Sequence, residues 1–149
     1  MNKVEVDNEK NEVRIYHRFK VGDKIYINTK SRENQSPQTI YKVIAFIKSP
    51  PLITYQVVGY NYCMEKMAEF YDDSDDTKKL YLAIIKDLEF KIGNKVKIKS
   101  SYFKDVHTIT DIEIQIGERG YDIYYYIDGD EDKNYSDAYY TGSQLDLIN

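Results

Sequence analysis

The chain has 149 residues, of which 42% are hydrophobic and 31% charged, and its formal net charge is −4. This apolar content is sufficient for a packed core and excludes a disordered chain. The negative charge argues against a main role in neutralising phosphates along a duplex. Sixteen Tyr and five Phe with no Trp favour half-buried pleated surfaces, so composition predicts an all-β fold.

A single cysteine, Cys63, excludes an internal disulfide framework and a multi-cysteine zinc site. No apolar run approaches the ~18 residues of a membrane span, and the first residues lack a signal-peptide core. The bias towards Lys, Ile, Asn and Tyr is typical of AT-rich genomes, such as those of low-GC bacteria and their phages. We therefore expect an intracellular protein, in the cytoplasm of a bacterial or phage-infected cell.

Residues 1–14 predict an N-terminal arm, with a short edge strand at Val4–Val6 followed by a polar turn. Downstream, the stretch Phe19-Lys-Val-Gly-Asp-Lys-Ile-Tyr-Ile27 occurs twice in related form. It returns as Phe90-Lys-Ile-Gly-Asn-Lys-Val-Lys-Ile98, with apolar residues kept apolar. Each copy predicts a glycine turn and an opening strand that has one apolar face.

After the first copy, a polar loop precedes two apolar stretches at 39–47 and 52–58, which predict an antiparallel pair of strands. Segment 61–79 differs, because Met64, Met67, Ala68 and Tyr71 fall at helical spacing before an acidic run. It predicts a short helix or an irregular excursion. A strand resumes at 80–85.

After the second copy, apolar and polar residues alternate over 107–116. The step from Ile109 to Ile112 breaks the alternation and predicts a β-bulge near Asp111. A turn at 117–120 and strands at 121–127, 135–140 and 144–148 complete the pattern.

The offsets between the halves indicate a repeat. Phe90 follows Phe19 by 71 positions (90 − 19), and Ile112 follows Val43 by 69, as Tyr124 follows Tyr55. Leu145 follows Leu88 by only 57. The economical interpretation is a duplicated unit with one insertion, at 61–79 of the first copy.

Such a unit, with a Gly-Asp opening strand, a long first loop, three hairpin-linked strands and a short closing strand, resembles the Src-homology-3-like (SH3-like) small barrel. The second half, with Tyr124-Tyr-Tyr-Ile-Asp-Gly-Asp130 and Ser143-Gln-Leu-Asp-Leu147, is most similar to the Tudor and KOW modules of that superfold. The resemblance implies two tandem barrels. The expected division is an arm at 1–14, a first barrel at 15–89 with its insertion at 61–79, and a second barrel at 90–149.

Tudor-like domains that read methylated side chains use an aromatic cage, and the matching positions form the candidate binding surface. These positions are Tyr102, Phe103, Tyr124, Tyr126 and Tyr135. The sequence departs from the pattern in having no Trp. The alternative interpretation is a set of tyrosines half-buried in a small aromatic-rich barrel.

A second candidate surface is basic. Lys91, Lys95, Lys97 and Lys99 recur along the second opening strand with Lys104 nearby, and neighbouring aromatic rings could stack on single-stranded bases. Alternating lysines on an exposed strand also serve solubility alone.

No pattern indicates catalysis, a metal or a cofactor. Cys63 and the two histidines, His17 and His107, are scattered. The acidic positions at 128, 130 and 132 resemble the start of a calcium loop, but Lys133 stands where that loop needs Gly and Tyr139 where it needs Glu.

We therefore expect a non-catalytic protein-binding or assembly module, such as an accessory or inhibitor protein of a phage or mobile element. The alternative is a nucleic-acid-associated module that uses the lysines. No membrane partner is expected.

Overall fold

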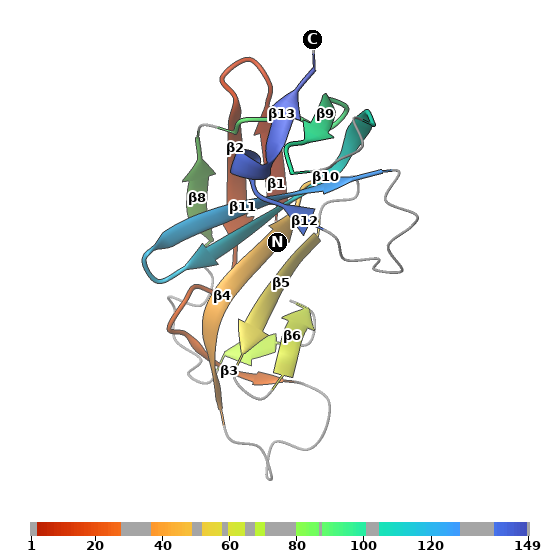
Figure 1. Ribbon diagram of the computed structural model, residues 1–149. Helices are drawn as coiled ribbons and strands as arrows, with labels where there is room; N and C mark the ends of the chain where they lie inside the picture. The colour runs from red at the N-terminus through yellow and green to blue at the C-terminus, as the bar shows by residue number, and fades with distance from the viewer. Residues whose placement is uncertain are drawn as a thin grey trace.

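The computed structural model describes residues 3–27, 37–48, 52–57, 60–64, 68–70, 80–86, 88–100, 105–128 and 139–148. These residues form an all-β fold with one short 3-10 helix (Figure 1). The elements are β1 (Lys3–Asp7), β2 (Glu12–His17), β3 (Lys24–Ile27), β4 (Gln38–Phe46), β5 (Leu52–Val57), β6 (Tyr60–Met64), β7 (Ala68–Phe70), β8 (Tyr81–Ile85), β9 (Lys95–Ile98), β10 (His107–Gly117), β11 (Gly120–Ile127), β12 (Tyr139–Tyr140), η4 (Gly142–Gln144) and β13 (Leu145–Leu147).

Two runs of five strands share one pattern of antiparallel pairing. In the first, β3 pairs with β4 and β7, β4 with β5, and β5 with β6. In the second, β9 pairs with β10 and β13, β10 with β11, and β11 with β12. Both runs belong to one ten-stranded sheet, and among the described strands this sheet does not close into a barrel.

The two opening turns agree in detail. Gly22 has φ 97° and Gly93 has φ 94°, values at which an L side chain would be strained. The Gly22 N–H donates to the carbonyl of Ile40 at 2.8 Å, and the Gly93 N–H donates to that of Ile109 at 2.9 Å. The glycine of the repeated stretch therefore has a conformational role in both copies.

A buried tyrosine marks the third strand of each run. Tyr55 meets Phe19 edge to face, with ring centroids 5.1 Å apart, and Tyr125 meets Phe90 in the same way at 5.2 Å. The match expected from the sequence, Tyr55 with Tyr124, is therefore wrong by one residue. Neighbouring strand residues face opposite sides of the sheet, so Tyr125 takes the core position and Tyr124 the outer one.

The two runs join through their second strands. β4 and β10 pair antiparallel, with Ala45 opposite Ile114 and Phe46 opposite Glu113. Ala45 and Ile114 are 69 positions apart, the same offset as Ile40 and Ile109 (114 − 45 and 109 − 40). Exchanging the two runs maps this pair onto itself, as at a two-fold interface between identical subunits. The junction thus has an approximate two-fold axis.

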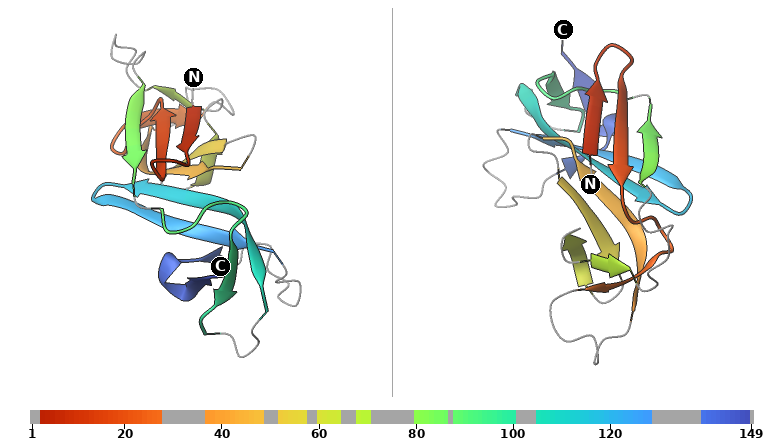
Figure 2. Two further views of the ribbon diagram at one scale, coloured as in Figure 1. Left: turned by 90° about the horizontal axis from the view of Figure 1, so that it is seen from above. Right: turned by 180° about the vertical axis from the view of Figure 1, so that it is seen from behind.

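A second sheet packs on one side of this junction. β1, β2 and β8 form a three-stranded antiparallel sheet with β2 in the centre. Figure 2 shows it on one side of the β10–β11 hairpin, with β9 and β13 on the other. Val13 and Ile15 of β2 belong to the same buried cluster as Ile112 and Tyr125. One core therefore connects the small sheet with the larger one.

The expected insertion at 61–79 needs correction. Its described parts are not helical, because β6 ends at Met64 and Ala68–Phe70 forms β7. β7 pairs with β3 as β13 pairs with β9, so Ala68–Phe70, rather than Leu88, is the counterpart of Leu145–Leu147. Met64 and Ala68, two of the residues at helical spacing, belong to strands, because β6 pairs with β5 and β7 with β3. Residues 65–67 and 71–79 lie outside the described residues.

Other sequence predictions are confirmed. The edge strand expected at Val4–Val6 lies within β1, and the register between β10 and β11 shifts between Ile109 and Asp111, where the bulge was expected. The division at 14/15 and 89/90 stays a prediction. Strand pairing crosses both boundaries, because β1 pairs with β2 and β4 with β10.

Candidate functional site

An aromatic face lies on the side of the central strands opposite the core. Glu113 alternates with the core residues Ile112 and Ile114, so its side chain points away from them. Strand pairing places Phe46 on one side of Glu113 and Tyr124 on the other. The aromatic face consists of Phe46, Glu113, Tyr124, Tyr126 and Tyr139.

Its rings contact one another. Tyr139 of β12 lies 4.8 Å from Tyr124 and 6.2 Å from Tyr126 between ring centroids, and Phe46 lies 6.1 Å from Tyr126. Tyr139 is 51% exposed. Strands from both runs therefore supply one continuous ring surface that solvent reaches at Tyr139.

Glu113 is the buried polar centre of this face. It is only 7% exposed, and this burial raises the pKa of its carboxyl group above the usual value. The Gln115 amide donates to the carboxylate at 3.1 Å, and the Lys42 ammonium donates to the Gln115 amide oxygen at 2.9 Å. The amide thus bridges the carboxylate and the nearest cation.

The first run lacks the counterparts of two members of this face, Glu113 and Tyr124. At an offset of 69, the counterpart of Glu113 is Ile44 (113 − 69), and at an offset of 70 the counterpart of Tyr124 is Thr54 (124 − 70). Both counterparts are buried and neither is charged or aromatic. The aromatic face is therefore a difference between two otherwise matched halves, which favours a role in binding over a role in the fold.

The structure brings together two of the five aromatic residues expected at the binding surface, Tyr124 and Tyr126. Tyr102, Phe103 and Tyr135 lie outside the described residues. Sequence reasoning missed Phe46, Glu113 and Tyr139. Glu113 could have been found by counting back from the predicted turn at 117–120, because Gly117 pairs with Gly120 and hence Glu113 with Tyr124.

Four of the five lysines expected at the basic surface lie among the described residues. Lys95 and Lys97 lie on β9 and Lys99 follows it, whereas the Lys91 ammonium donates to the carbonyl oxygen of Asn8 at 2.8 Å. The Lys95 ammonium donates to the Thr108 hydroxyl, and that of Lys99 lies 3.7 Å from the Asp146 carboxylate. Lys104 lies outside the described residues. Three of the four described ammonium groups, those of Lys91, Lys95 and Lys99, therefore lie beside an oxygen of the chain.

The histidines lie in separate places. Nδ1 of His17 lies 2.7 Å from the Phe19 carbonyl oxygen, and Nδ1 of His107 lies 2.7 Å from that of Asp128. Burial lowers the pKa of His17. Cys63 lies on β6. In the described part of the chain, no three His, Cys, Asp or Glu side chains gather in a way that could hold a metal ion.

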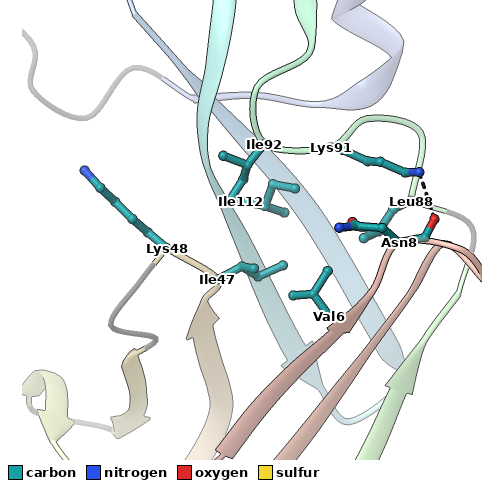
Figure 3. Close-up of a pocket in the computed structure, with 8 residues that line it drawn as sticks. All are labelled: Val6, Asn8, Ile47, Lys48, Leu88, Lys91, Ile92 and Ile112. Atoms are coloured by element: carbon teal, nitrogen blue, oxygen red, sulfur yellow. Dashed lines mark hydrogen bonds between the residues drawn. The ribbon is translucent and has the colours of Figure 1, made fainter.

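A pocket of about 330 Å³ opens where the two sheets and the two runs meet (Figure 3). Its walls include Val6 of β1, Ile47 at the end of β4, Ile92 from the second opening turn and Ile112 of β10. Val6 is 47% exposed and Ile92 44%. Lys48 and Lys91 also line it, and none of the described lining residues is acidic.

No family model, curated protein or solved structure matches the chain. Within the described residues, no helix is long and apolar enough to cross a membrane.

Proposed function

We propose that the chain is a non-catalytic protein-binding or assembly module built from two related, open SH3-like units. Two matched runs, each with an opening strand, three hairpin-linked strands and a closing strand on the opening one, support this architecture. The superfold hosts many tasks, so the function rests on the surface of the units. Its origin in a phage or mobile element remains part of the proposal.

The aromatic face is the observation that carries the proposal. Tyrosine is enriched at protein interfaces because it combines a large apolar area with a hydrogen-bonding tip. Tyr124 and Tyr139 pack edge to face and Tyr139 is half exposed, so little side-chain freedom remains to be lost on binding. Ring surface that is already ordered is suited to a protein contact.

The charges of the face favour a partner with a cationic side chain. Asp122 neighbours Gln115 across the hairpin, and Asp111 neighbours Tyr126, so two further carboxylates flank the rings. A Lys or Arg of the partner could lie against the ring faces while it approaches Glu113. Because Glu113 is already desolvated, such a cation would interact with it more strongly than with an exposed carboxylate.

The test is a quantitative pull-down from the native host. The tagged protein should recover one stoichiometric partner, and the double variant Tyr124→Ala/Tyr139→Ala should recover at least about tenfold less, as expected when ring residues at the centre of an interface are removed. The matched control is Tyr41→Ala, which truncates a tyrosine that is 41% exposed. Equal recovery by the double variant and the wild type, with the fold intact, would refute the proposal.

The nucleic-acid alternative has less support. Lys91, Lys95 and Lys99 each lie beside an oxygen of the chain, and phosphate binding would compete with those contacts. If nucleic acid were the ligand, a gel shift at low salt should be abolished when Lys95, Lys97 and Lys99 are changed to Glu. Absence of any shift at low salt would remove this alternative.

A further inference from the structure

The pocket between β1 and β10 is a second surface, separate from the aromatic face. Its wall residue Ile112 alternates with Glu113 along β10, so the two side chains point to opposite sides of the sheet. The two surfaces can therefore be altered independently. The function proposed for the aromatic face does not involve the residues of this pocket.

The pocket combines apolar walls with a basic rim. Val6, Ile47, Ile92 and Ile112 contribute aliphatic side chains, and Lys48 and Lys91 are the charged residues among the described ones that line the pocket (Figure 3). One of the three N–H groups of the Lys91 ammonium donates to the carbonyl oxygen of Asn8, and the other two can donate to a ligand. An apolar group that carries or neighbours negative charge is complementary to this arrangement.

The approximate two-fold relation indicates the shape of the apolar group. Lys91 corresponds to Lys20 at an offset of 71 (91 − 20). The Lys20 ammonium lies 5.2 Å from the centroid of the Tyr81 ring, which β8 supplies. The described residues that line the pocket with Lys91 are aliphatic apart from Asn8 and Lys48, and none of them is aromatic. A pocket therefore lies beside Lys91, whereas an aromatic ring lies beside Lys20.

We propose that this pocket binds an aromatic side chain from an acidic segment of a protein partner. The ring enters between Val6 and Ile92 and lies against the Lys91 ammonium, as Tyr81 lies against Lys20. Carboxylates on either side of the anchor residue pair with Lys48 and Lys91. A volume of about 330 Å³ accommodates one aromatic side chain, so a single anchor defines the docking site.

The test uses a fluorescein-labelled probe peptide in which one Tyr is flanked on each side by two acidic residues. Fluorescence anisotropy with the full chain should give a Kd below about 1 mM, in the range of a single-anchor contact. A peptide of the same design with lysines as flanks should bind at least about tenfold more weakly, because its charges oppose those of Lys48 and Lys91.

Two variants locate the binding. Ile92→Gln makes an exposed wall polar and should weaken binding about tenfold, whereas Ile84→Gln, at a side chain 40% exposed on β8, should leave it within twofold. The pair Lys48→Glu/Lys91→Glu should weaken binding about tenfold or more. The pair Lys24→Glu/Lys86→Glu changes the net charge equally and should not, because charges outside the site are screened.

Several outcomes would overturn the inference. The acidic peptide could fail to bind at 1 mM, or the two lysine double variants could lose the same affinity for it. Ile92→Gln could also bind the peptide as tightly as the wild type. Binding of 4-phenylbutyrate without binding of the peptide would instead assign the pocket to a small apolar acid and equally overturn a protein partner. The double variant Tyr124→Ala/Tyr139→Ala should bind the peptide normally, so failure of the proposed function would be distinguishable from failure of this inference.

Discussion

Replacement of Ile114 by alanine removes three buried carbon atoms at the approximate two-fold axis, where the side chain is 0% exposed. At about 0.8 kcal/mol per buried methylene, the lost transfer free energy is about 2.4 kcal/mol. The cavity left behind raises the total loss of unfolding free energy to about 3–4 kcal/mol. With an unfolding entropy of about 2.1 cal/mol/K per residue, 149 residues give about 0.31 kcal/mol/K, so Tm should fall by about 10 °C.

The assay is thermal and urea unfolding, followed by far-UV circular dichroism and by tyrosine fluorescence. One buried cluster connects both runs and the small sheet, so both probes should report a single transition that moves as a whole. The matched control, Ile84→Ala, truncates the same kind of side chain where it is 40% exposed and should cost less than about 1 kcal/mol.

Two results would refute this reasoning. A loss below about 1 kcal/mol would mean that Ile114 is not at the centre of the core. Two separate transitions, of which Ile114→Ala shifts only one, would mean that the runs unfold independently, as autonomous tandem domains would.

Three further predictions follow from single residues. Because the pKa of Glu113 is raised in the folded state, the unfolded state ionises first, and the free energy of unfolding falls as pH rises from about 4.5 through the folded-state pKa. In urea titrations at pH 4–8, the free energy of unfolding of Glu113→Gln should therefore rise relative to that of the wild type as pH rises. A difference that stays constant with pH would contradict this prediction. Gly93→Ala should lower the free energy of unfolding by about 1–2 kcal/mol through backbone strain at φ 94°, and not through a clash, because nothing lies within 4 Å of the added carbon. Gly117→Ala, at a glycine without a positive φ, should cost less than about 1 kcal/mol. Equal losses of the two variants in chemical unfolding would argue against strain. Tyr125→Phe removes the hydroxyl that accepts from the Glu89 N–H at 3.2 Å and should cost about 0.5–1.5 kcal/mol, and no measurable change in urea unfolding would exclude that bond as a contributor.

The sequence predicted part of the aromatic face, whereas it predicted nothing of the pocket. Tyr124 and Tyr126 were accessible from the sequence because they lie at alternate positions of a predicted strand and match the cage positions that the Tudor-like resemblance implies. Phe46 was not accessible, because only the pairing of β4 with β10 places it beside Glu113. That pairing joins residues 67 positions apart (113 − 46), and no local pattern specifies such a partner.

The pocket was equally inaccessible. Val6, Ile47 and Ile92 come from three segments that are distant in sequence and meet only when the small sheet packs on the junction. In the sequence they are three ordinary aliphatic residues, of which Ile47 and Ile92 adjoin a lysine and Val6 lies between Glu5 and Asp7. The exposed fractions of Val6 and Ile92, which make the pocket a candidate binding surface, are a property of the folded chain alone.

The sequence by itself determined the all-β class, the two glycine turns, the bulge near Asp111 and most strands, because period-two patterning and special backbone angles act over a few residues. The tertiary structure alone decided where Ala68–Phe70 pairs, that Tyr125 rather than Tyr124 corresponds to Tyr55, and how the two runs join. Strand pairing and burial depend on contacts distant in sequence, and a shift of one residue exchanges the two faces of a strand. The repeated stretch could therefore predict that the chain is duplicated, but only the register of β4 against β10 placed the copies around a common axis.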